Sequence, residues 1–222
     1  MIGTAGGAIA GQVARLGDPN SYLAMAGGIA IAALLGLLVL WRAKPSFADL
    51  GFRRPIALRQ ALWFLPLVAE VALIPVFTGV TVTPVAVAIF ASVALAAAFS
   101  EEIWYRGIVL ALLRHKGTRF AVAASSAMFA ALHLTNLFGG KSIEYASLQF
   151  LFAGLFGFVA AEIVALTGSL WPVIAWHFGH DFFSYIGGDD LSTAGLVSVG
   201  IGSAILLGYA VWLWRQLPET AC

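Results

Sequence analysis

Charged side chains and cysteine are both scarce in this sequence. Only 10% of its 222 residues are charged, against about 25% in an ordinary soluble domain, and 61% are hydrophobic. This composition excludes a soluble globular domain and predicts an integral membrane protein. The single cysteine, Cys222, excludes an intramolecular disulfide and a cysteine-based metal site. Lys and Arg form no run with interleaved aromatic residues, so we expect no nucleic-acid partner.

Several common functional signatures are also missing. The zinc-protease motif H-E-x-x-H does not occur. No G-x-S-x-G motif surrounds Ser125, Ser126 or Ser184, so a serine nucleophile lacks support. We detect no internal inverted repeat of the kind that many transporters show.

Long apolar stretches between short polar connectors predict about seven transmembrane helices, and therefore an all-α, polytopic membrane helix bundle. We expect chain 1–222 to form a single integral membrane domain, with residues 1–20 as an interfacial or poorly ordered arm. Pro66 and Pro75 predict kinks in the second span, and Pro84 suits the start of the third. The expected spans are 22–40, 61–78, 84–113, 120–138, 145–166, 170–186 and 196–214.

Basic residues fall mostly on one side of this predicted bundle. Arg15 and Lys141 lie on the opposite side, and Arg106 lies within the membrane. By the positive-inside rule, we expect the N-terminus outside and the C-terminus in the cytoplasm, in the cell (plasma) membrane. The residues on the cytoplasmic side are Arg42, Lys44, Arg53, Arg54, Arg59, Arg114, Lys116, Arg119 and Arg215.

Three charged residues interrupt the third span, namely Glu101, Glu102 and Arg106. Charges at this depth cost several kcal/mol unless they are paired or face a wet cavity. Glu102 and Arg106 are four residues apart, so they share a helix face and can pair. Glu101 points about 100° away from Glu102 and is free for a different task.

Two further polar clusters lie on other spans. His133 is on the fourth, and His177 and Asp181 share a face of the sixth, with His180 able to share part of it. One such cluster could simply hydrogen-bond neighbouring helices. Three clusters at similar depth favour a common cavity.

A carboxylate and histidines around such a cavity can polarise a water and stabilise an oxyanion, which is the chemistry of amide hydrolysis without a covalent nucleophile. The alternative left open is a divalent metal such as zinc, held with one open position by Glu101, His133 and His177.

Together, these motifs resemble the signature of the CAAX protease and bacteriocin-processing family (CPBP, or Abi) of intramembrane glutamate-type proteases. The resemblance covers about residues 100–185 and implies a catalytic core in 100–186. The motifs that carry it are Glu101-Glu102-x-x-x-Arg106, Phe129-x-x-x-His133 and His177-x-x-x-Asp181.

The resemblance also implies roles for these residues. Glu101 would activate the water with help from His133. His177 and Asp181 would stabilise the oxyanion, although many members have Asn in place of this Asp. Glu102 and Arg106 would pair and fix the shape of the site.

We therefore expect an intramembrane endopeptidase of CAAX-protease type whose peptide or protein substrate, possibly lipidated, reaches the site from the cytoplasm and meets membrane lipid. Two alternatives stay open: a transporter that uses the Glu/His set as a relay, and a non-catalytic membrane scaffold or immunity protein. Outside the motifs, we interpret Glu70 as a protonated or helix-paired carboxyl, and Glu162 lies near the cytoplasmic end of its span, where it could reach the interface. Asn136 and Gln149 would form interhelical hydrogen bonds.

Overall fold

The computed structural model describes residues 18–42, 51–53, 62–80, 82–138, 140–187 and 191–218, with side chains from residue 24 onward. This part of the chain is helical, with no strand, as the prediction of an all-α bundle requires. The predicted arm, apart from 18–20, and most of the connector between the first two spans lie outside the described residues.

Helices of the described chain coincide with the seven predicted spans. They are α2 (Asp18–Arg42), α3 (Leu65–Thr78), α4 (Pro84–Glu102) with its continuation, α6 (Thr118–His133), α7 (Ile143–Thr167), α8 (Trp171–Gly187) and α9 (Thr193–Trp214). The continuation of α4 is a π-helix, η2 (Ile103–Val109), followed by α5 (Leu110–Leu113) and a 3-10 turn, η3 (Arg114–Lys116). A second 3-10 turn, η4 (Leu134–Leu137), extends α6.

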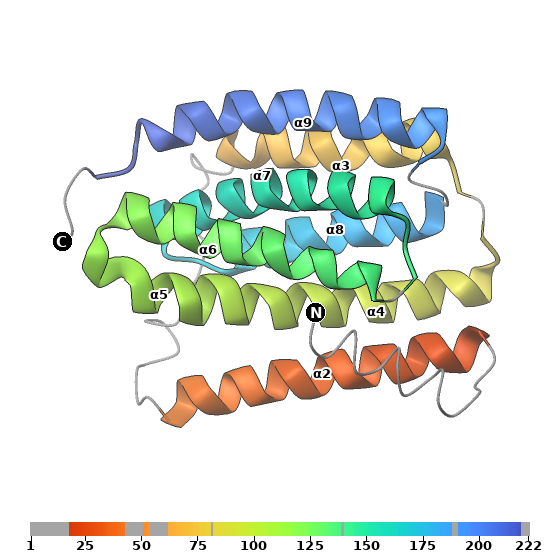
Figure 1. Ribbon diagram of the computed structural model, residues 1–222, viewed down its shortest axis with the longest axis horizontal. Helices are drawn as coiled ribbons and strands as arrows, with labels where there is room; N and C mark the ends of the chain where they lie inside the picture. The colour runs from red at the N-terminus through yellow and green to blue at the C-terminus, as the bar shows by residue number, and fades with distance from the viewer. Residues whose placement is uncertain are drawn as a thin grey trace.

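Five of these helical segments are long and apolar enough to cross a membrane by themselves: Ala24–Arg42, Pro84–Lys116, Thr118–Leu137, Ile143–Thr167 and Thr193–Trp214. The apolar helix at Leu62–Thr78 is shorter. Helix α8 has only 17 residues, and three of them are His177, His180 and Asp181. These two shorter helices lie alongside the long ones (Figure 1).

Helix starts follow from short polar residues at the caps. Thr83 precedes Pro84, and its hydroxyl oxygen accepts a hydrogen bond from the Ala86 amide at 3.4 Å. Ser142 and Ser192 cap α7 and α9 in the same way, at 3.2 and 3.0 Å. Each cap satisfies an amide that the first helical turn leaves unpaired, which fixes where these helices begin.

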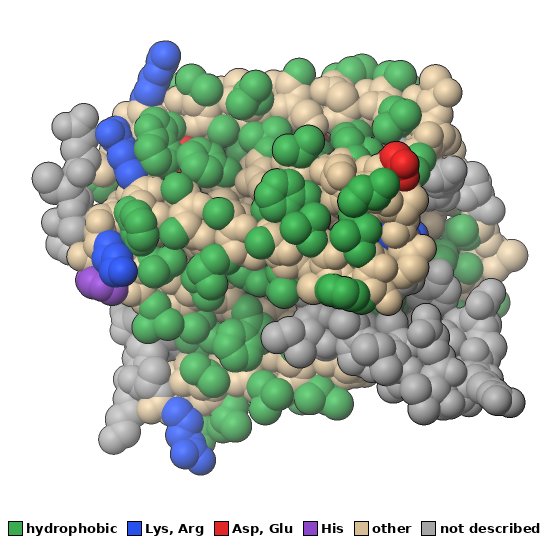
Figure 2. All heavy atoms as spheres, viewed as in Figure 1, with side chains coloured by type: hydrophobic (Ala, Val, Ile, Leu, Met, Phe, Trp, Pro, Cys, Tyr) green, Lys and Arg blue, Asp and Glu red, His purple; other side chains and the backbone are tan. Residues whose placement is uncertain are grey.

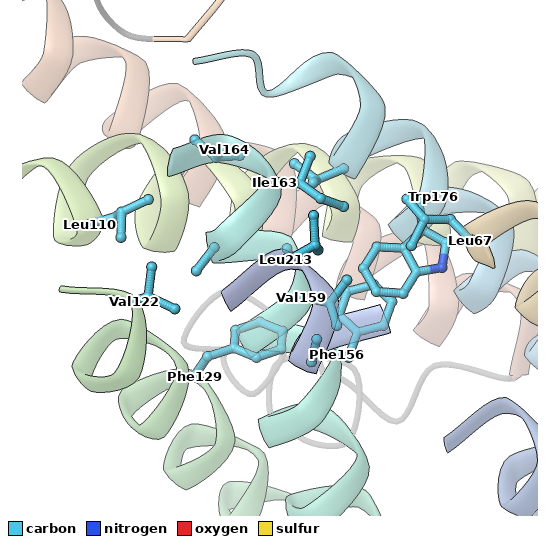
Figure 3. Packing of buried hydrophobic residues seen from close by; sticks show 14 of the residues in the cluster. Leu67, Leu110, Val122, Phe129, Phe156, Val159, Ile163, Val164, Trp176 and Leu213 are labelled. Carbon is cyan, nitrogen blue, oxygen red and sulfur yellow. The ribbon is translucent and has the colours of Figure 1, made fainter. Parts of the chain in front are cut away.

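The helices run nearly side by side along the long axis of the molecule (Figure 1). Helix α4 packs against α2 on one side and α8 on another, α6 packs against α7, and α3 lies against both α8 and α9. Buried apolar side chains fill the space between them, with the Phe156 and Trp176 rings stacked at 3.7 Å between centroids (Figure 3). This packing brings α4, α6 and α8, the helices that carry the three motifs, into one region.

On the face shown in Figure 2, exposed charge lies at the ends of the bundle. Lys and Arg side chains gather mainly at one end of the face shown in Figure 2, and hydrophobic side chains are spread along its length. The basic end includes the C-terminal residue of α2 (Arg42), the η3 turn and Arg215, which caps α9. An apolar surface between polar ends is the pattern expected of a protein whose sides contact lipid.

Candidate active site

The two adjacent glutamates close α4, immediately before the π-helix η2. Both are buried, Glu102 completely and Glu101 at 6% exposure. At the far end of η2 the Leu110 amide donates to the carbonyl of Tyr105, five residues earlier, which is the π-helical pairing. Such π-helical turns are rare and occur often at functional sites.

Glu102 is the centre of a buried hydrogen-bond network. Its Oε1 accepts from Nη1 of Arg106 at 3.2 Å, so the predicted pairing of these two residues is present. The same oxygen also accepts from Nδ1 of His177 on α8 at 2.8 Å, a contact that spacing within one helix could not reveal. Glu102 therefore links α4 to α8 at the level of the site.

His177 lies among three carboxylates. With Nδ1 bonded to Glu102, its Nε2 is 3.9 Å from Oε2 of Glu101 and 3.6 Å from Oδ2 of Asp181. Because Nδ1 donates to a carboxylate, the tautomer and ring orientation of His177 are set, and Nε2 is directed at the other two acids. A carboxylate that orients a histidine in this way is a recurrent feature of hydrolytic sites.

His133 is buried at the last residue of α6, and its ring is fixed by its own helix. Nδ1 lies 2.8 Å from the carbonyl oxygen of Phe129. A carbonyl can only accept, so Nδ1 carries the proton and Nε2 of the neutral ring offers a lone pair. His133, His177 and Asp181 are all close enough to Glu101 to interact with it electrostatically, so the predicted residues do share one region.

Phe129 forms the apolar floor of this region, and Figure 3 shows it within the buried core. Its ring centroid is 4.6 Å from that of His133 and 6.1 Å from that of His177, with edge-to-face geometry in both pairs. The guanidinium carbon of Arg106 lies 4.2 Å from the same ring centroid, a cation–π contact. One phenyl ring thus contacts a residue of each of the three motifs.

Gly157 on α7 makes room for Arg106. A Cβ at this position would lie 2.9 Å from Nη2 of Arg106 and 2.9 Å from Cδ1 of Phe129. The glycine permits close helix packing, and it lets a cation and an aromatic ring approach the backbone. In the described part of the chain, Nε and Nη2 of Arg106 and Oε2 of Glu102 are buried without a hydrogen-bond partner.

Asp181 is the most exposed member of the cluster, with 22% of its side chain accessible, compared with 6% for His177 and 7% for Glu101. It borders a cavity of about 140 Å³ between α3, α7, α8 and α9. Polar residues lining the cavity include Glu70, Gln149, His180 and Ser184. A cavity of this size and polarity can hold several water molecules beside the acidic cluster.

A second polar cluster was only partly anticipated. Glu70 was expected to be protonated or paired with another helix, and it is paired, since it accepts from Trp176 Nε1 and His180 Nδ1 at 2.8 Å each. His180 therefore bonds to α3, although its spacing suggested a shared face with His177. Asn136 donates to Gln149 as predicted. Glu162, which by its place in the span could have reached the interface, is instead completely buried.

The proposed zinc ligands do not form a metal site in the described part of the chain. No group of three His, Cys, Asp or Glu side chains there is arranged to hold a metal ion. Nδ1 of His177 is bonded to Glu102 and Nδ1 of His133 to the Phe129 carbonyl, so Nε2 is the atom that each ring offers to the site. The chemistry proposed below uses no metal.

Comparison with known proteins agrees with the motifs. The family model described as type II CAAX prenyl endopeptidase Rce1-like matches residues 83–183, a little under half of the chain. No curated protein and no solved structure matches. The matched segment runs from the cap of α4 into α8 and contains all seven named residues of the three motifs. With its apolar spans this chain is an integral membrane protein, and its residues 83–183 are similar to the Rce1-like type II CAAX prenyl endopeptidases.

Proposed function

We propose that this protein is an intramembrane endopeptidase that hydrolyses a peptide bond with an activated water, without a covalent nucleophile. The observation that carries the proposal is the placement of His177. Its Nδ1 is held by Glu102, and its Nε2 lies within 4 Å of the side chains of both Glu101 and Asp181. A peptide carbonyl placed beside Nε2 would have a carboxylate on one side and, when Nε2 is also protonated, a hydrogen-bond donor on the other.

In the proposed reaction, Glu101 accepts a proton from a water as the water oxygen attacks the peptide carbonyl carbon. The lone pair of His133 Nε2 helps to orient that water. The negative charge that develops on the former carbonyl oxygen is stabilised by His177 when Nε2 is protonated. The tetrahedral intermediate collapses as the C–N bond breaks, and the proton held by Glu101 passes to the leaving amine.

Glu102 and Arg106 would act through His177. Glu102 fixes the imidazole of His177 through Nδ1. The charge of Arg106 holds Glu102 in place, and Arg106 is itself held by its contact with the Phe129 ring. The two adjacent glutamates would therefore have different tasks, one at the reacting water and one in the support of the site.

The substrate would be a peptide or protein segment that reaches the membrane, including one that carries a lipid. The positive-inside rule supports an orientation with the basic end in the cytoplasm and the N-terminus outside. We propose residence in the plasma membrane and a single membrane domain over the whole chain, with the Rce1-like segment as its catalytic core.

The test is cleavage of a library of fluorogenic and lipidated peptides by the purified protein in detergent, with product masses measured. Glu101→Ala and His133→Ala should each lower kcat by about 10²–10⁴-fold. Glu144→Ala and His115→Ala are matched controls, because both side chains are exposed and lie on other parts of the chain. Unchanged cleavage by Glu101→Ala would refute the mechanism. Uptake by proteoliposomes that depends on Glu101, without cleavage, would favour the transporter hypothesis.

A further inference from the structure

Glu70 is a buried carboxylate that the proposed reaction does not use. It lies in the middle of α3 at 3% exposure and accepts two hydrogen bonds from α8. Oε2 accepts from the indole Nε1 of Trp176 and Oε1 from Nδ1 of His180, both at 2.8 Å. The donors are four residues apart, so one carboxylate accepts hydrogen bonds from two successive turns on the same face of α8.

These two donors alternate along α8 with the residues of the proposed site. Trp176 and His180 face α3, whereas His177 and Asp181, each one position further, face the glutamates of α4. The helix is therefore held from both sides, by Glu70 on one face and by Glu102 on the other. Rotation or sliding of α8 that displaced His177 would have to break the bonds to Glu70 as well.

Packing makes this connection stiff. The His180 ring is stacked on Phe152 with centroids 4.9 Å apart, and the Trp176 indole is stacked on Phe156 at 3.7 Å. On α9, a Cβ at Gly202 would lie 3.3 Å from Cγ of Glu70, so the stem of the glutamate has little space to move. The carboxylate is thus fixed by its neighbours as well as by its two hydrogen bonds.

We propose that Glu70 is a positioning residue of the hydrolytic site: through Trp176 and His180 it sets the rotation and height of α8, and thereby places His177 and Asp181 against Glu101 and Glu102. This inference rests on the proposed function for its kinetic consequence. Its structural consequence, the placement of the His177 ring, does not depend on that function.

The kinetic test compares Glu70→Ala with Glu70→Gln. The alanine variant loses both bonds to α8, and kcat should fall about 10–100-fold while KM changes less than about 2-fold, since small displacements of reacting groups have effects of this size. Glutamine can accept from Trp176 and donate to His180, so Glu70→Gln should recover most of kcat. Glu162→Ala is the matched control: its carboxyl is also fully buried, but on α7, and neither oxygen has a hydrogen-bond partner in the described structure.

A second measurement reads the position of His177 without any substrate. The chain has four histidines, so ¹⁵N spectra of the imidazoles in detergent can be assigned residue by residue. Glu70→Ala should shift the signals of both His180 and His177, whereas Glu70→Gln should leave His177 close to its original position. An unchanged His177 signal in Glu70→Ala, or equal kcat in Glu70→Ala and the original protein, would overturn the inference. Failure of the original protein to cleave any peptide would instead refute the proposed function.

Discussion

Replacing Gly157 with alanine tests whether close packing behind Arg106 supports the site. The added Cβ would lie 2.9 Å from Nη2 of Arg106 and 2.9 Å from Cδ1 of Phe129, and separations below 3.0 Å require something to move. Neither neighbour has free space, because Arg106 is 2% exposed and Phe129 is 1% exposed. Any movement of Phe129 is passed to His133, whose ring it contacts.

Overpacking of a dense interior costs about 1–3 kcal/mol. For a chain of this size each kcal/mol lowers Tm by about 2–4 °C, so Gly157→Ala should lose roughly 2–12 °C. We also expect kcat to fall about 10-fold or more, because Arg106 holds Glu102 and Glu102 holds His177. The loss should exceed the gain in helix propensity from glycine to alanine, which is about 1 kcal/mol at most.

Thermal unfolding in detergent and peptide cleavage measure the two effects. Gly200→Ala and Gly208→Ala on α9 are matched controls, because nothing lies within 4 Å of a Cβ at either position. These variants should be as stable as the original protein or slightly more so, with unchanged kcat. If Gly157→Ala behaved like the controls, the close approach of Arg106 and Phe129 to α7 would not be needed, and the reasoning would be wrong.

Three further outcomes follow from other contacts. Asp181→Asn should retain cleavage, since asparagine keeps an oxygen near His177 and adds an amide donor. Asp181→Ala should lower kcat about 10-fold or more. Equal activity of the asparagine and alanine variants would contradict a polar role for Asp181. Trp104→Phe removes the 2.9 Å bond from the indole to the Ala32 carbonyl on α2 and should lower the free energy of unfolding by about 0.6 kcal/mol, seen as a small drop in Tm. A chelator such as EDTA should leave cleavage unchanged, and a loss that zinc restores would show that a metal takes part.

Most of the fold was predictable from the sequence because membrane spans obey simple rules of length and hydrophobicity. Each predicted span coincides with a helix, and Pro84 marked a helix start that the structure contains. The pairing of Glu102 with Arg106 was equally predictable, since it depends only on helical spacing. Residues that meet within one helix can be inferred in this way.

Contacts between helices were harder to predict from the sequence. Spacing along α8 could not indicate that His177 turns toward Glu102 while His180, three residues later, turns toward Glu70. The burial of Glu162 was also not predicted, because its place near one end of its span allowed access to the interface. In the structure it is completely buried. The rotation and tilt of a helix decide which partner a side chain meets and how deeply it is buried. The hydropathy of a single segment does not determine that rotation or tilt.

The π-helix η2 is the feature that ties these contacts together. It begins directly after Glu102, where the i→i+4 ladder changes, and it carries Trp104 toward α2 and Arg106 toward α7. A regular α-helix through the same residues would turn more per residue, so it could not direct both side chains to these partners without rotating the glutamates. We infer that the π-helix separates two requirements: the α-helical end of α4 aims Glu101 and Glu102 at His177, and the wider turn that follows anchors that end to the neighbouring helices.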